Sequence, residues 1–152
     1  MAELKERLRG DLSAAMRARD QVRMRTLRSA LAAVTNEEVA GRASRELSDE
    51  DVVKVLTREA RKRREAAEAF AGAGREDQAA AERAEGDVIA GYLPAQLGDD
   101  ELAAVVDSAI AETGATDMKA MGQVMKAVTP RVAGRADGAR VAAEVRRRLG
   151  SG

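Results

Sequence analysis

Apolar residues recur every three or four positions along most of the chain, which is the spacing of one face of an amphipathic helix. In the first segment they are Leu4, Leu8, Leu12 and Met16. In the second segment they are Met24, Leu27, Leu31 and Val34. These two segments, separated at Arg19-Asp20, predict a helical hairpin. The stretch 36–47 loses the period and contains Gly41, so it predicts a connection.

A long helix is predicted after this connection, from residue 49 to about residue 70. Ser48 and the three acidic residues that follow it form a typical helix start, because they satisfy and complement free backbone N–H groups. The predicted buried side is Val52, Leu56, Ala60, Ala67 and Phe70. The glycines of 71–74 end this helix. A further helix is predicted over 76–91, with Ala80, Ala84 and Val88 buried.

The dipeptide Leu93-Pro94 predicts a domain boundary, because proline disfavours helical geometry in the residue before it. We therefore expect an N-terminal helical lobe over 1–93 and a small C-terminal lobe over 94–152. Three short helices are predicted in the second lobe, over 99–112, 117–129 and 137–149. Pro130 is expected to stop the second of these, and Asp137 to cap the third. No segment alternates with the period of two expected for strands, so the predicted fold class is all-α.

The middle helix of the C-terminal lobe carries two unusual features. Met118, Met121 and Met125 share a face, which favours filling of irregular core gaps over a binding groove. Gly122 lies within this helix, where glycine costs about 1 kcal/mol relative to alanine. Close approach of a neighbouring backbone is the expected reason for that glycine.

Composition excludes most catalytic designs. The chain has no Cys and no His, which removes thiolate and imidazole nucleophiles, bases and metal ligands. Acidic pairs such as Glu82 with Glu85, or Asp99 with Glu101, are expected to be surface and capping residues. The stretch 134–138 lacks the strand and the Lys-Ser or Lys-Thr of a phosphate loop. We therefore expect no catalytic residue, no metal and no cofactor.

The beginning of the chain is charged, and no apolar run approaches the roughly 20 residues needed to span a bilayer. These features predict a cytoplasmic protein without a membrane partner.

Charge is unevenly distributed although the formal net charge is zero. Residues 65–117 hold 13 acidic and two basic side chains, whereas 118–152 hold two acidic and eight basic ones. The eight basic residues are Lys119, Lys126, Arg131, Arg135, Arg140, Arg146, Arg147 and Arg148. If several share one face, they would bind RNA phosphates in a salt-dependent manner. Alternatively, these side chains only form a well-solvated helical surface. A second basic cluster, over 58–64, has the same two interpretations, a phosphate-binding site or a solvated surface.

Four segments resemble the GatB/YqeY family. They are TLRSALAAVTNEE (26–38), REAAEAFAGAGRED (64–77), EGDVIAGYLPAQL (85–97) and MGQVMKAVTPRVAGRADGARVAAEVRRRL (121–149). The resemblance implies an α-helical module similar to the C-terminal tail of the B subunit of aspartyl/glutamyl-tRNA amidotransferase, a glutamine-dependent carbon–nitrogen ligase, where the tail helps to hold tRNA. The cradle domain that carries the ligase chemistry is absent, so no activity is expected from this chain alone.

The resemblance also implies a nucleic-acid contact region in the C-terminal lobe. Its residues are Lys119, Gly122, Lys126, Arg131, Gly134, Arg135 and Arg140, to which the charge pattern adds Arg146 and Arg147. The expected partner is tRNA or a tRNA-aminoacylation or amidotransferase complex. Two other functions remain open: a helical protein-interaction adaptor without RNA binding, and a subunit that contributes to amide transfer only when assembled.

Overall fold

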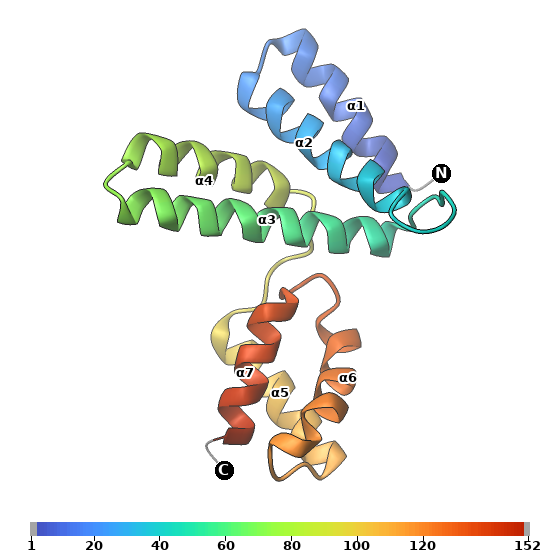
Figure 1. Ribbon diagram of the computed structural model, residues 1–152, viewed down its shortest axis with the longest axis vertical. Helices are drawn as coiled ribbons and strands as arrows, with labels where there is room; N and C mark the ends of the chain where they lie inside the picture. The colour runs from blue at the N-terminus through green and yellow to red at the C-terminus, as the bar shows by residue number, and fades with distance from the viewer. Residues whose placement is uncertain (1–2, 151–152) are drawn as a thin grey trace. The chain divides into compact units, whose positions relative to one another are not determined.

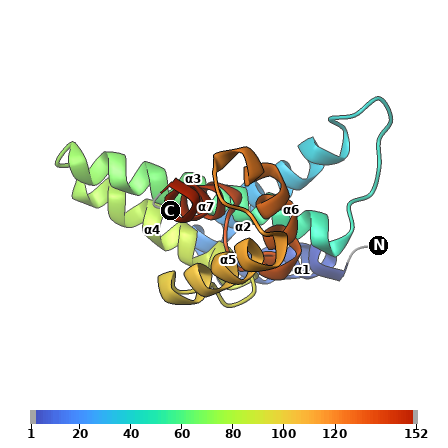
Figure 2. The same cartoon turned by 90° about the horizontal axis from the view of Figure 1, so that it is seen from below.

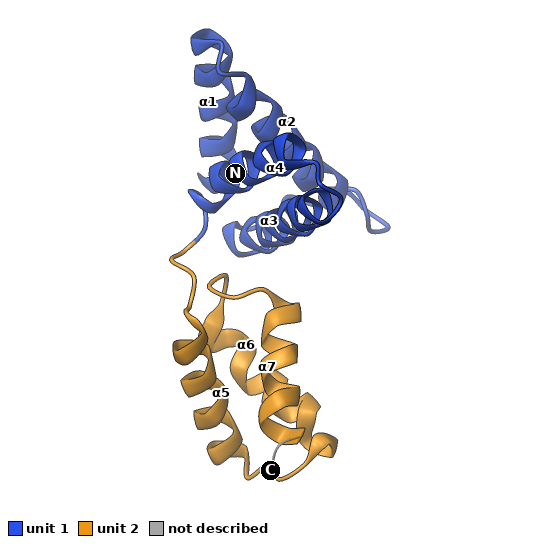
Figure 3. Ribbon diagram, turned by 90° about the vertical axis from the view of Figure 1, so that its left-hand side faces the viewer, with its two compact units in different colours: residues 1–93 blue, residues 94–152 orange. Residues whose placement is uncertain are grey.

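The computed structural model describes residues 3–150, and within this range it contains seven α-helices, one short 3-10 helix and no strand (Figure 1). The predicted all-α fold class is confirmed. The chain divides into two compact units, of which the first ends at Leu93 and the second begins at Pro94 (Figure 3).

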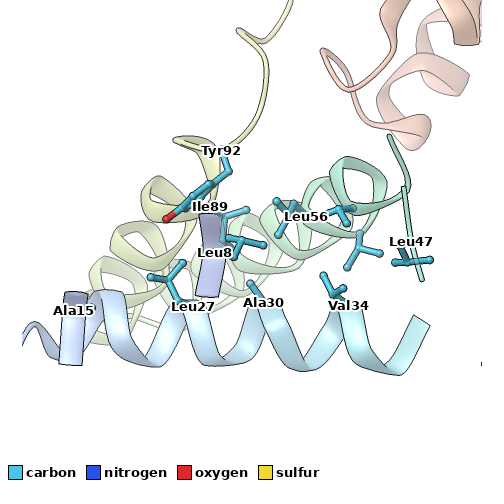
Figure 4. Packing of buried hydrophobic residues seen from close by; sticks show 11 residues of the cluster. Leu8, Ala15, Leu27, Ala30, Val34, Leu47, Leu56, Ile89 and Tyr92 are labelled. Atoms are coloured by element: carbon cyan, nitrogen blue, oxygen red, sulfur yellow. The ribbon is translucent and has the colours of Figure 1, made fainter. Parts of the chain in front are cut away.

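Unit 1 contains two pairs of helices. They are α1 (Glu3–Ala18), α2 (Gln21–Glu38), α3 (Asp49–Gly72) and α4 (Glu76–Ala90). Helix α1 packs against α2 (Figure 1), and α3 packs along α4, with the two lying side by side in both views (Figures 1 and 2). In the core, Leu27, Ala30 and Val34 of α2 lie on one face of that helix (Figure 4). They pack with Leu56 of α3 and Ile89 of α4. The buried face of α2 is thus built from the three- and four-residue spacing seen in the sequence.

Side-chain caps begin two of these helices. Ser48 Oγ accepts a hydrogen bond from the backbone N–H of Asp51 at 3.2 Å, which confirms the predicted start of α3. A carboxylate oxygen of Asp20 accepts one from the backbone N–H of Arg23 at 3.1 Å. Each cap satisfies a backbone donor that has no partner inside its helix.

Unit 2 is a three-helix arrangement with its own core. Its elements are α5 (Asp99–Thr113), the 3-10 helix η1 (Met118–Ala120), α6 (Met121–Val132) and α7 (Gly138–Gly150). Valines at four-residue spacing from α6 and α7 form the centre, together with Leu102 and Val106 of α5. Asp137 accepts a hydrogen bond from the backbone N–H of Arg140 at 3.0 Å, as expected for the predicted cap of α7.

The predicted helix over 117–129 differs from the structure. Its first turn is the separate 3-10 helix η1, and Pro130 does not stop α6, which continues to Val132. Proline removes one backbone donor and crowds the preceding turn. Because Pro130 lies only two residues from the end of α6, little of the helix follows it.

The prediction for the methionine face is right only in part, and the one for Gly122 is wrong. Met121 and Met125 are partly buried and pack against the core of unit 2, whereas Met118 is 44% exposed. The fully buried stripe of α6 is formed by its valines, Val124, Val128 and Val132. A Cβ atom at Gly122 would meet no neighbouring atom within 4 Å, so no backbone approaches it. Glycine is therefore not required at this position for packing.

Two predicted buried faces in unit 1 are right only in part. In α1, Leu8 is buried and Leu4 and Leu12 pack against the core, but Met16 is 49% exposed and Ala15 occupies the buried position at the end of the helix. In α4, Ala80 is exposed, whereas Ile89 and the carboxylate Glu85 are buried. A pattern based only on apolar residues misplaces this face, because a buried charged residue belongs to it. Helix α2 also extends to Glu38, three residues into the segment predicted to be a connection.

None of the described helices is long and apolar enough to cross a membrane.

Candidate nucleic-acid interface

The cationic residues predicted to bind RNA all lie in unit 2, but they have different surroundings. Lys119 is in η1, Lys126 and Arg131 are in α6, and the Arg135 side chain leaves the α6–α7 loop. The remaining four belong to α7: Arg140, Arg146, Arg147 and Arg148. Their contacts separate them into three groups.

The first group consists of Arg135 and Arg140, which bind the segment before α5 to the α6–α7 loop and the start of α7 by hydrogen bonds. Arg135 Nε donates to the carbonyl oxygen of Ala95 at 3.1 Å, and its own carbonyl accepts from Leu97 N–H at 2.8 Å. Arg140 Nη1 donates to the Leu97 carbonyl at 2.7 Å, and its Nη2 donates to Asp99 at 2.8 Å. These arginines satisfy backbone acceptors of an irregular segment, which is a structural role.

Gly134 belongs to the same arrangement. Its φ angle is +73°, a left-handed conformation that favours glycine, and it follows the end of α6. Its carbonyl accepts a hydrogen bond from Gln96 Nε2 at 2.9 Å. Gly134 therefore shapes the loop that holds residues 95–97.

The second group consists of arginines paired with carboxylates. Arg131 pairs with Glu112 of α5. Arg148 pairs with Asp107 of α5 at 3.5 Å and with Glu144 at 3.0 Å. Glu112 and Asp107 belong to the acidic middle of the sequence, so part of the basic C-terminal segment is neutralised inside unit 2.

Glu144 lies between two arginines of its own helix. Arg147 Nη2 donates to Glu144 at 2.7 Å, and Arg148 Nε donates to it at 3.0 Å. The hydrogen bond from Arg147 is the main cause that lowers the pKa of Glu144 below its ordinary value. The same contact raises the pKa of Arg147. Arg147 is thus engaged with α7 itself, although its side chain is 64% exposed.

The third group contains Lys119, Lys126 and Arg146. All three are exposed, and among residues 3–150 their side chains have no hydrogen-bond or ion-pair partner. Lys126 lies two positions from both Val124 and Val128, which places it on the outer side of α6 at about 100° per residue. We call these three residues the unit 2 cations.

The unit 2 cations come from elements that contact one another. Helix α6 packs against α7, and η1 contacts both helices. Because a short loop joins α6 to α7, the start of α6 and the end of α7 lie at the same end of unit 2 (Figure 1). Lys119 and Arg146 are therefore at that end, and Lys126 lies further along α6. Gly122 is exposed nearby, at the start of α6.

The second basic cluster, over 58–64, is largely paired within unit 1. Arg58 pairs with Glu37 at 3.1 Å, and Lys62 pairs with Glu59 at 3.1 Å. Arg63 donates to Ser29 Oγ at 2.7 Å and also lies beside Glu85. These contacts join α2, α3 and α4, so the cluster has a structural function in the fold.

The acidic pairs expected to be surface and capping residues also have structural partners. Glu85 accepts from Arg25 Nε at 2.7 Å and is buried, contrary to the expectation of a surface residue. Asp99 accepts from Arg140, and Glu101 accepts from the backbone N–H of Gly98 at 3.1 Å. Within the described part of the chain, no three acidic side chains are close enough together to hold a metal ion.

Comparison with known proteins supports the resemblance found in the sequence. No curated protein matches the chain. The Yqey-like protein family, in contrast, matches residues 5–149, which cover most of both units and include all three groups of cations. The chain therefore belongs to the Yqey-like protein family.

Proposed function

We propose that this chain is a non-catalytic accessory module that binds tRNA through the unit 2 cations, Lys119, Lys126 and Arg146. The main support for this proposal is that these three exposed side chains have no hydrogen-bond or ion-pair partner among residues 3–150. In addition, the elements that carry them, η1, α6 and α7, contact one another. Cations without a protein partner are available to neutralise phosphates and to release their counterions. The family's relation to the tail of the amidotransferase B subunit supports tRNA as the RNA concerned.

The mode of recognition follows from the side chains present. The chain has no Trp, one Tyr and one Phe, so it lacks the aromatic platforms on which single-stranded bases stack. Lysine and arginine contacts to phosphates depend on the shape of the RNA backbone and do not read base sequence. We expect binding in the micromolar range near physiological salt, which is typical of sequence-independent contacts.

A filter-binding titration with unfractionated tRNA at several salt concentrations tests the proposal. The triple variant K119A/K126A/R146A should bind about tenfold or more weakly at 0.1 M salt. Three lost phosphate contacts should also reduce the slope of log affinity against log salt by about 2 to 3.

The matched control is R42A/K54A/R75A, which removes three exposed cations of unit 1 that also have no side-chain partner among residues 3–150. It changes the net charge equally and should bind tRNA as the unmodified chain does. If both triple variants bind equally well, or if binding does not respond to salt, the proposed tRNA contact is wrong. A protein-interaction adaptor would then be the better explanation.

A further inference from the structure

The turn between α1 and α2 is rich in arginine. Residues 17–28 contain five arginines, no lysine and a single acidic residue, Asp20. The Asp20 carboxylate accepts the backbone N–H of Arg23 and caps α2, and Arg25 pairs with Glu85 of α4. The other four arginines are Arg17, Arg19, Arg23 and Arg28. All four are exposed, and their side chains have no hydrogen-bond or ion-pair partner among residues 3–150.

Arg17, Arg19 and Arg23 lie close together in the fold. Arg17 is in the last turn of α1, Arg19 is in the turn itself, and Arg23 is in the first turn of α2. The turn is fixed by hydrogen bonds from Arg19 N–H to the Met16 carbonyl at 3.2 Å and from Asp20 N–H to the Ala15 carbonyl at 3.0 Å. Three guanidinium groups therefore project from one short, ordered segment.

The backbone of Arg19 provides an independent observation. Its φ angle is +58°, and it is the one residue other than glycine with a positive φ among residues 3–150. Glycine adopts this left-handed conformation at a helix end without steric cost, whereas a side chain with a Cβ atom is strained there. Strain of this kind, retained at an exposed turn, indicates that the side chain has a use.

We propose that Arg17, Arg19 and Arg23 form a second phosphodiester-binding site, which binds the RNA backbone at the α1–α2 turn of unit 1. Guanidinium groups match phosphate oxygens with paired N–H donors, which a lysine ammonium does not. An acidic protein partner fits less well, because stable protein interfaces centre on buried aromatic and apolar anchors. Around this turn, the one large hydrophobic side chain exposed among the described residues is Met16, which offers a single apolar contact to a protein partner.

This inference rests on the proposed function, since both sites bind the same tRNA. Two sites on two units would increase affinity by raising the effective concentration of the second contact once the first has formed. Six phosphate contacts should give a salt slope of about −4 to −5, compared with about −2 to −3 for three. The salt dependence of the unmodified chain therefore distinguishes one site from two.

The experiment compares R17A/R19A/R23A with K119A/K126A/R146A and with the control R42A/K54A/R75A, using unfractionated tRNA. We expect each of the first two variants to bind about tenfold or more weakly and to lose about 2 to 3 from the salt slope. If R17A/R19A/R23A binds like the control while K119A/K126A/R146A is weakened, the second site does not exist and the proposed function stands. The opposite result leaves the α1–α2 site and overturns the unit 2 contact.

Single substitutions at Arg19 separate charge from folding. Arg19→Gly removes the charge and relieves the backbone, so it should bind tRNA several-fold more weakly without lowering the melting temperature. Arg19→Lys keeps the charge and should retain most of the affinity. Unchanged binding by Arg19→Gly and by R17A/R19A/R23A would overturn the proposal. Displacement of tRNA from the α1–α2 turn by polyglutamate at an equal charge concentration would overturn its assignment to phosphodiesters.

Discussion

At the scale of single residues, Tyr92, near the end of unit 1, contacts two charged side chains of α1. Its hydroxyl donates to the carboxylate of Asp11, and the Arg7 guanidinium lies 4.7 Å from the centroid of its ring. The latter geometry is a cation–π contact. Burial is the main cause that raises the pKa of Tyr92 to about 12, and the hydrogen bond and negative charge of Asp11 raise it further.

We predict that Asp11→Asn lowers the pKa of Tyr92 towards 10, the ordinary value of tyrosine. The neutral amide cannot repel the phenolate as the carboxylate does. In the unmodified chain, the contribution of neutral Tyr92 to stability is complete below pH 10 and is lost as the pH rises towards 12. Ultraviolet absorbance of the phenolate measures this titration directly. Asp100→Asn, in unit 2, is the control and should leave the titration unchanged.

At the scale of helices and their connections, one buried ion pair holds the two ends of the α2–α3 connection together. Lys5 Nζ in α1 lies 2.8 Å from Glu38 at the end of α2, and both side chains are nearly inaccessible to solvent. Glu38 also accepts a hydrogen bond from the backbone N–H of Leu47 at 3.4 Å. The hydrogen bond from Lys5 is the main cause that lowers the pKa of Glu38 below 4.5, although burial opposes it.

We predict that Glu38→Ala lowers the free energy of unfolding by about 3 kcal/mol, because Lys5 would be left as a buried charge without a partner. The double variant K5L/E38L should cost much less, since it removes both charges. The stabilising effect of ionised Glu38 is present above pH 4.5 and is lost as the pH falls below it. Chemical denaturation at neutral and acidic pH measures both effects. Equal losses in the single and double variants would contradict this account.

The sequence predicted the helices better than it predicted the functions of charged residues. Spacing of apolar residues and the caps Ser48 and Asp137 identified the helix starts, because these signals are local. The burial of Glu85 depends on Arg25 and Arg63, which lie far away in the sequence. No local pattern contains that pairing, so the face of α4 was misplaced.

The same limitation affected the candidate site. Counting positive charge located the basic segment, but it could not distinguish Arg135 and Arg140, which bind carbonyls of residues 95 and 97, from cations without such partners. Those carbonyls lie about 40 positions earlier in the chain. Only the fold shows which cations have partners within unit 2. The nucleic-acid interface itself remains a prediction.

At the scale of the whole molecule, each unit has its own hydrophobic core. The buried residues of unit 2 form one cluster from α5, α6 and α7, together with Leu97 and Ala136. The hydrogen bonds of Arg135 and Arg140 attach residues 95–97 to this same unit. A fragment that begins at Pro94 therefore retains the core of unit 2 and the hydrogen bonds that hold residues 95–97 against it.

We predict that the fragment 94–152 folds alone into a helical domain with a cooperative thermal transition. Because so short a domain buries relatively little surface, its stability should be modest. Arg140→Ala should lower its melting temperature further, since it frees the Leu97 carbonyl and Asp99. Circular dichroism of the fragment provides the measurement. A helical spectrum without a cooperative transition would show that unit 2 does not fold independently.

The position of Tyr92 has a practical consequence for such work. The chain has no tryptophan and one tyrosine, and this tyrosine belongs to the core of unit 1. Intrinsic fluorescence excited near the tyrosine band is therefore a reporter of unit 1, and it does not detect the melting of unit 2. Helical ellipticity, in contrast, sums over both units. Any temperature interval in which ellipticity falls while tyrosine emission stays constant can be assigned to unit 2 without introducing a label.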